Sequence, residues 1–171
     1  MSYVIRPARS DEFALLREVE RRAGARFATV GLDDIANGEP VGVEFLSAIA
    51  LAGAIRVAAD DSDCPVGFTL LGILDRAVHV YELDVVPEHG RRGLGARLIE
   101  AAAAYASALS QEALTLSTFR DIPWNGPYYE RLGFRYLVRR EWTPALHLLH
   151  NREIQMKLPV DRRAFMRKDL K

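Results

Sequence analysis

The stretch of sequence that decides the fold covers residues 82–96 and reads ELDVVPEHGRRGLGA. It begins as a β-rich run that stops at Pro87, and after Gly93 the apolar residues recur at helical spacing. Gly90, Gly93 and Gly95 remove side chains where the following helix exposes its first backbone N–H groups. Those N–H groups and the positive end of the helix dipole attract an anion. The stretch therefore predicts a strand, a glycine-rich turn and a helix that cradle a phosphate or pyrophosphate.

Two arginines, Arg91 and Arg92, lie inside this turn and add charge-assisted donors for phosphate oxygens. Spacing alone leaves a second interpretation open, in which the turn only joins a strand to a helix and its arginines are solvated. The glycine order is not the G-x-G-x-x-G of dinucleotide-binding proteins, and the sequence has no G-x-x-x-x-G-K-[ST] loop. A nucleotide-binding domain is therefore disfavoured.

On either side of this stretch, short strands and helices are predicted. The strands cover residues 3–7, 54–59, 66–74, 77–86, 113–119, 134–140 and 153–158. The helices follow the Ser10-Asp11 cap, cover 43–51 and 94–109, follow Asn125, and run from Asp161 to the end, with a loop around 31–42. Most strands follow one another directly, which favours antiparallel pairing. We expect a mixed α/β (α+β) fold, with a largely antiparallel sheet of about six to seven strands flanked by helices.

Composition favours one domain over residues 1–171, because 49% of the residues are hydrophobic and a chain of this length buries a sizeable core. Lys plus Arg and Asp plus Glu both count 23, so the formal net charge is zero. Nucleic-acid binders show a basic excess, so we expect no nucleic-acid partner. The single cysteine, Cys64, excludes an internal disulfide and fits a reducing cytoplasm.

Membrane and metal sites are not expected either. The first residues lack the apolar core of a signal peptide, and the most apolar run, Phe45–Ile55, is too short to span a bilayer. His147 and His150 do not form an H-E-x-x-H pattern with Glu153, so no metal is predicted. The sequence thus indicates a cytoplasmic protein.

Two motifs, LDVVP at 83–87 followed by RRGLGA at 91–96, and PYYERLGF at 127–134, carry a resemblance to a known family. The first resembles the acyl-CoA-binding motif of the GNAT superfamily of N-acetyltransferases. PYYERLGF at 127–134 resembles its C-terminal Y-x-x-x-G-F signature, and IRPA at 5–8 resembles a common start. The resemblance spans essentially the whole chain and implies a GNAT-like fold.

The resemblance implies that acetyl-CoA is the acyl donor and that no metal is needed. The residues that would bind it are Val85, Val86, Gly90, Arg91, Arg92, Gly93, Leu94, Gly95 and Ala96. The pantetheine arm would bond to backbone near Val85, and the pyrophosphate would lie on the glycine-rich turn. The family pattern [QR]-x-x-G-x-[GA] places Gln or Arg where this chain has Gly90, and the arginine here follows one place later. The backbone cradle is unaffected by that change.

Direct attack of an amine on the thioester is the mechanism that the resemblance implies. Tyr129 matches the family tyrosine that protonates the departing CoA sulfur, as a general acid. The alternative is an aromatic residue that anchors a short helix. No covalent intermediate is needed, so Cys64 is interpreted as structural.

The general base has two candidates on the predicted strand 77–86. His79 has an ordinary pKa near 6.5 that suits proton transfer, and Glu82 is a carboxylate whose pKa burial would raise. Strand alternation places His79, Tyr81 and Val85 on one face and Glu82 and Asp84 on the other. Water alone remains a third possibility for the base.

Substrate-side residues are expected between the strand 113–119 and the helix of Tyr129. They are Thr118, Phe119, Asp121, Trp124 and Tyr128. Asp121 would attract an ammonium group and Trp124 would stack on a substrate, whereas the alternative for 123–126 is a tight loop around a packed indole. Asn125 is interpreted chiefly as a helix cap.

The function that these residues and the resemblance indicate is transfer of an acetyl or short acyl group from acetyl-CoA to a primary amine. The acceptor is a small molecule or a peptide amine, and the sequence does not identify it. A non-catalytic module that senses acyl-CoA is the alternative. A homodimer is compatible with the sequence, which does not define the oligomeric state.

Overall fold

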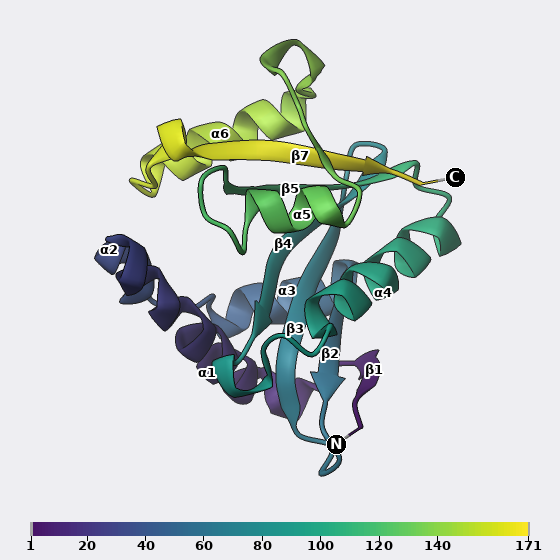
Figure 1. Ribbon diagram of the computed structural model, residues 1–171. Helices are drawn as coiled ribbons and strands as arrows, with labels where there is room; N and C mark the ends of the chain where they lie inside the picture. Colours follow the sequence, from purple (N-terminus) through teal and green to yellow (C-terminus); the bar gives the residue numbers. More distant parts are fainter. Residues whose placement is uncertain (1, 171) are drawn as a thin grey trace. The chain divides into compact units, whose positions relative to one another are not determined.

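The computed structural model describes residues 2–170 and contains one mixed sheet (Figure 1). The seven strands follow the order β1-β2-β3-β4-β5-β7-β6, and the pairs β1–β2, β2–β3, β5–β7 and β6–β7 are antiparallel. The strands are β1 (Val4–Pro7), β2 (Ala54–Ala59), β3 (Pro65–Leu74), β4 (Ala77–Val85), β5 (Ala113–Phe119), β6 (Arg135–Tyr136) and β7 (Arg163–Asp169). The predicted fold class, a largely antiparallel sheet flanked by helices, is confirmed.

Six α-helices accompany the sheet within residues 2–170. They are α1 (Phe13–Gly24), α2 (Asp33–Ala36), α3 (Val43–Ala52), α4 (Leu94–Ala108), α5 (Gly126–Arg131) and α6 (Pro144–Gln155). The chain divides into two compact units. The first comprises the residues up to Gly72 together with Val80–Ala104, and the second comprises Ile73–His79 and the residues from Tyr105 onward.

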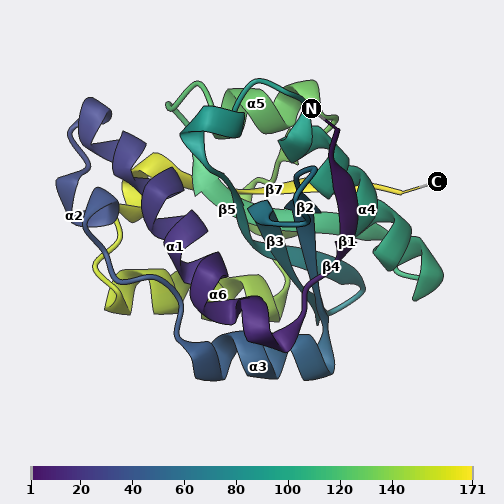
Figure 2. The same ribbon diagram turned by 90° about the horizontal axis from the view of Figure 1, so that it is seen from below.

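The first unit packs helices on both faces of its strands. Figure 2 shows α1 and α3 on one side of β2 and β3, and the first turns of α4 on the other. In α1 the buried residues Phe13, Leu16, Val19 and Ala23 recur at helical spacing, so one face of this helix enters the core. Phe68 and Leu70 of β3 are fully buried in the same cluster. Val86 and Leu94, on either side of the glycine-rich turn, belong to the same core.

The second unit is built on the long β5–β7 pair, whose register runs from Ala113↔Asp169 to Phe119↔Arg163. Both views place α5 and α6 on opposite faces of this pair (Figures 1 and 2). On the α6 side, Leu146 packs with Phe165 and Leu137 in a small core. Tyr129 belongs to α5, which covers the face of the β5–β7 pair opposite α6.

The C-terminal third contains the main errors of the predicted elements. Residues 153–155 of the strand predicted over 153–158 belong to α6, and the helix predicted from Asp161 onward is mostly β7. Helix α6 starts where the Thr143 hydroxyl accepts a hydrogen bond from Leu146 N, with Pro144 in the first turn. Strand β7 pairs on both edges, and α5 and α6 cover its two faces, so the consecutive residues 164–166 are all buried and show no alternation.

Strand β4 also departs from the predicted pattern. A β-carbon added to Gly72 would lie 2.8 Å from the Tyr81 ring, whereas one added to Gly67 would lie 2.9 Å from Val85 Cγ2. Gly67 and Gly72 are five residues apart on β3 and therefore face opposite sides. Tyr81 and Val85 thus lie on opposite faces, and the expectation that they share one was wrong. An irregularity of the β-bulge kind lies between them.

Candidate active site

The turn that follows β4 is held by a short chain of backbone hydrogen bonds. Val86 N donates to Val66 O at 2.9 Å, His89 N donates to Val86 O at 3.0 Å, and Gly90 N donates to Pro87 O at 3.0 Å. Tyr3 Oη and His89 Nδ1 lie 2.9 Å apart and tie this turn to the start of the chain. The turn is therefore positioned before any ligand arrives.

The N-terminus of α4 has the properties of an anion cradle. The first bond of the helix runs from Arg97 N to Gly93 O at 3.1 Å, so the N–H groups of Leu94, Gly95 and Ala96 precede it and lack helical acceptors. Gly93 has φ +76°, and a β-carbon there would meet nothing within 4 Å. Open space therefore borders these donors on the side where a side chain would otherwise lie.

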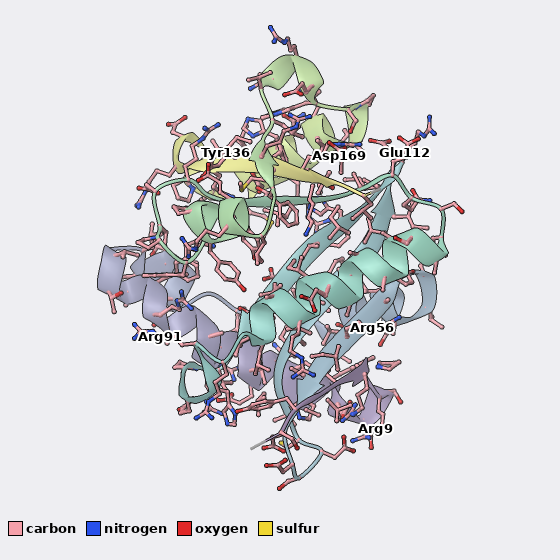
Figure 3. All side chains as sticks on the ribbon, turned by 45° about the vertical axis from the view of Figure 1, so that its right-hand side comes forward. Arg9, Arg56, Arg91, Glu112, Tyr136 and Asp169 are labelled. Atoms are coloured by element: carbon pink, nitrogen blue, oxygen red, sulfur yellow. The ribbon has the colours of Figure 1, made fainter. Side chains whose placement is uncertain are left out.

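The arginines of the turn are both exposed, and Figure 3 shows Arg91 on the loop before α4. Arg91 adopts φ +57°, a left-handed conformation that is uncommon for a residue with a side chain. Both guanidinium groups are free to approach a phosphate. The structure thus brings together, in the first unit, all the residues predicted to bind the cofactor, from Val85 to Ala96.

Tyr129 lies in the second unit, on α5, and is 8% exposed. Its ring packs edge-on against Tyr128 and Phe134, with centroids 5.5 and 5.6 Å away. Its carbonyl oxygen accepts a hydrogen bond from Phe134 N at 3.0 Å, and Gly133 between them has φ +89°. The Y-x-x-x-G-F pattern is therefore a compact turn that fixes the tyrosine ring.

The predicted substrate-side residues have partners within the second unit. Thr118 is buried, and its Oγ1 accepts a hydrogen bond from Asn125 Nδ2 at 2.9 Å. This side chain of Asn125 thus does not cap α5, although Asn125 occupies the N-cap position. Asp121 forms an ion pair with Arg162 at 2.8 Å, and the Arg163 guanidinium lies 4.9 Å from the centroid of the Phe119 ring.

Tyr128 and Trp124 are both partly buried. Burial raises the pKa of the Tyr128 hydroxyl, and the Arg131 guanidinium lies 5.8 Å from the centre of its ring. The same unit encloses a cavity of about 470 Å³ that none of the five predicted substrate-side residues lines. Its polar wall is a network in which Arg163 and Ser117 both bond to Glu153, at 2.9 and 2.5 Å. Alternation in β5 and β7 alone does not reveal this network.

The surroundings of His79 do not suit the role of general base that the sequence suggested. It is 3% exposed, and its Nδ1 lies 2.9 Å from Thr115 Oγ1. Burial, and to a lesser degree the charge of Arg163, lowers the pKa of the imidazole to about 3. A buried, hydrogen-bonded imidazole that stays neutral is a poor proton acceptor for a substrate. We therefore correct this assignment: His79 supports the sheet.

The carboxyl groups near the end of β4 lie in the first unit. Glu82 is partly exposed, and its carbonyl oxygen accepts a hydrogen bond from Thr69 Oγ1 at 2.7 Å. Asp84, which sequence reasoning did not single out, has a buried carboxyl whose pKa is raised well above its ordinary value. Burial is the largest cause, and the charges of Glu82 and Glu20 add to it. The sequence did contain a signal for Asp84, because it is an acidic residue between the apolar Leu83 and Val85 inside the motif.

Comparison with known proteins identifies the family of this chain. Residues 52–136, about half of the chain, match the family model described as an acetyltransferase (GNAT) domain. The chain belongs to the GNAT superfamily. The matched range contains β4, the glycine-rich turn and the Y-x-x-x-G-F turn, so the two motifs that carried the resemblance lie inside it.

Solved structures of this superfamily share the fold over the whole chain. A GNAT-family acetyltransferase from Staphylococcus aureus Mu50 has a TM-score of 0.74 at 15% identity, with 99% of this chain and 100% of that chain covered. The PaiA N-acetyltransferase of Thermoplasma acidophilum, solved with coenzyme A, has a TM-score of 0.73 at 18% identity, with the same coverage. The ribosomal-protein-S18-alanine N-acetyltransferase of Escherichia coli has a TM-score of 0.67 at 15% identity, covering 98% and 94%.

Membership in this superfamily indicates acyl transfer from an acyl-CoA. Within residues 2–170, no group of three or more His, Cys, Asp or Glu side chains is arranged to hold a metal ion. The same residues contain no helix that is both long and apolar enough to cross a bilayer.

Proposed function

We propose that this protein transfers an acetyl or other short acyl group from acetyl-CoA to a primary amine. The observation that carries the proposal is the open space beside Gly93 at the N-terminus of α4. A pyrophosphate suits that position, because free N–H groups, the helix dipole and two exposed arginines all favour negative charge there. The GNAT motif, which covers these residues, supports the same ligand.

Different residues of the cradle contact different parts of acetyl-CoA in this proposal. Val85 and Val86 end β4 and offer backbone groups to the pantetheine arm, while Gly90 to Ala96 receive the pyrophosphate. Acetyl-CoA supplies the activated acyl group as a thioester. The protein therefore needs to hold the two reactants, remove a proton from the amine and return one to sulfur.

Tyr129 is the proposed acid that protonates the departing thiolate. The packing of its ring against Tyr128 and Phe134 orients the hydroxyl and limits its motion, which suits a positioned proton donor. Glu82, or a water molecule, remains a proposed route for the amine proton, whereas His79 is set aside because it is buried and satisfied.

The acceptor is a small-molecule or peptide amine in this proposal. The name of one structural neighbour, the ribosomal-protein-S18-alanine N-acetyltransferase, gives a protein acceptor, whereas the name of the PaiA N-acetyltransferase gives none. We also propose that residues 1–171 act as one catalytic domain in the cytoplasm. A homodimer is compatible with this function and is not required by it.

The proposal is tested by release of free thiol from acetyl-CoA in the presence of a panel of primary amines. Wild-type protein is expected to turn over at least one amine, and Tyr129→Phe to lower kcat by about 100-fold with an unchanged Kd for acetyl-CoA. Tyr136→Phe, which removes a hydroxyl from a half-buried site on β6, is the matched control with wild-type activity. Acetyl-CoA binding without turnover of any amine would favour the sensor module.

A further inference from the structure

Asp84 holds a carboxyl oxygen that the folded protein does not use. Its Oδ2 atom is buried and accepts no hydrogen bond from any residue that the structure describes. A buried polar atom without a partner costs free energy, so folded proteins rarely keep one unless it serves a ligand or a reaction. The oxygen is thus a candidate contact for a molecule from outside the chain.

The surroundings of Asp84 are acidic. Glu20 from α1 and Glu82 from β4 both raise the pKa of the Asp84 carboxyl, and only Arg26, in the segment after α1, opposes them. Glu20 itself is partly buried, and Val41 N donates to its two carboxylate oxygens at 3.2 and 3.1 Å. At Asp84 two carboxyl groups thus act against one guanidinium, whereas Arg17 and Arg21 lower the pKa of Glu20.

The position of Asp84 in the chain connects it to the chemistry. It is the residue directly before Val85, whose backbone is the proposed contact for the pantetheine arm, and it lies in the irregular part of β4. Glu20 of α1 and Arg26 lie near enough to affect the pKa of this carboxyl. The carboxyl and the proposed thioester site are therefore adjacent along one strand.

We propose that Asp84 binds the ammonium group of the acceptor and takes up its proton, and that the acceptor is a primary amine with no carboxylate beside the reacting nitrogen. The inference rests on the proposed function. An N–H bond of the ammonium breaks and an O–H bond forms on Asp84, which leaves a neutral amine. That amine attacks the thioester carbonyl, the C–S bond breaks, and the second nitrogen proton balances the one that sulfur gains.

Charge explains the choice of acceptor class. An α-amino acid would bring its carboxylate toward Asp84, Glu20 and Glu82, and like charges repel. An alkylamine, a polyamine or a lysine side chain brings only positive charge. A carboxyl group with a raised pKa also suits proton transfer near neutral pH.

The test uses matched pairs of amines that differ by one carboxylate: tyramine and tyrosine, histamine and histidine, 1,4-diaminobutane and ornithine. Wild-type protein with acetyl-CoA is expected to prefer at least one decarboxylated member by about tenfold or more in kcat/KM. Asp84→Asn should lower that kcat/KM by about 100-fold while leaving the Kd for acetyl-CoA unchanged. Asp75→Asn, in the exposed turn before β4, is the matched control with wild-type rates.

A pH profile separates catalysis from a merely structural role. The kcat/KM of wild-type protein should decline in acid as the Asp84 carboxyl becomes protonated, and Asp84→Asn should lose that decline. Wild-type rates in Asp84→Asn, or a preference for the amino acid in all three pairs, would overturn the inference.

A binding measurement distinguishes this inference from the proposed function. If coenzyme A binds and no amine is turned over, the proposed function fails, and Asp84 is then judged by thermal unfolding of the coenzyme A complex. Millimolar 1,4-diaminobutane or tyramine should raise the Tm of wild-type protein and leave that of Asp84→Asn unchanged. Equal shifts in both proteins, or no shift in wild-type protein, would contradict the role of Asp84.

Discussion

Two buried titratable groups on β4, His79 and Asp84, differ in how the fold satisfies them. His79 shares a hydrogen bond with Thr115, and burial lowers the pKa of its imidazole to about 3. Burial also acts on Asp84, but it raises the pKa of a carboxyl, and one oxygen of that carboxyl has no partner in the described chain. Burial thus disfavours the charged form of both groups.

This difference in hydrogen bonding distinguishes a structural residue from a candidate functional residue on the same strand. His79 has its partner inside the protein, so its removal should affect the free energy of unfolding. Asp84 has an unused acceptor, so its removal should affect the reaction and relieve the folded state. Residue type alone suggests the opposite assignment, because histidine is the more common general base at neutral pH.

The largest expected effect is the loss of unfolding free energy that His79 causes at acidic pH. Its pKa is lower in the folded state, about 3, than in the unfolded state, so the unfolded chain binds the extra proton between about pH 3 and 6.5. The free energy of unfolding therefore falls by several kcal/mol as the pH drops through that window, and His79→Gln should remove this part. Urea titrations of both proteins from pH 3.5 to 7 measure it. Parallel pH curves would show that the imidazole is not buried as described.

A smaller effect of opposite pH dependence is expected at Asp84. Its folded-state pKa is raised, so the folded state holds a proton that the unfolded state releases, and stability falls as the pH rises from about 4 through the folded-state pKa. Asp84→Asn should be more stable than wild-type protein at pH 8, and the gain should shrink toward pH 4. Urea unfolding at several pH values tests this. A variant that is less stable at pH 8 would mean that the carboxylate has a structural partner.

The smallest effect is expected at the hydrogen-bond partner of His79. Thr115→Val preserves the side-chain shape and leaves the imidazole Nδ1 without its hydroxyl, which should cost about 1–2 kcal/mol of unfolding free energy. Thr29→Val, at an exposed site, serves as the control. A loss no larger than in the control would place the stabilisation of His79 elsewhere.

Local signals in the sequence predicted most of the elements that build the cradle. Strands 54–59 and 113–119 and the start of α4 after Gly93 are confirmed, because glycines, prolines and clear periodicity mark their ends. Strand β7 was missed because it is buried on both faces and lies in a charged tail, so its pattern resembled a frayed helix. Its pairing with β5 is a long-range contact that no local window contains.

The candidate site was predicted by residue type and motif more than by environment. Tyr129 and the turn from Gly90 to Ala96 were named from their motifs, and their roles stay predictions. His79 was misjudged because burial and a hydrogen bond to a strand 36 residues away decide its pKa. Asp84 was overlooked because regular alternation placed it beside Glu82, whereas β4 is irregular there and α1 supplies its neighbours.

Calorimetric titration with coenzyme A tests the central claim most directly, in wild-type protein, Gly93→Val and Gly31→Val. Gly93 and Gly31 have nearly equal φ angles, +76° and +72°, and a β-carbon at either meets nothing within 4 Å, so both substitutions impose similar backbone strain. We predict saturable binding of one coenzyme A per chain to wild-type protein and Gly31→Val, and a Kd raised by about 100-fold or more in Gly93→Val. Equal affinity in all three proteins, or no binding to wild-type protein, would contradict the claim that the turn after β4 holds the diphosphate.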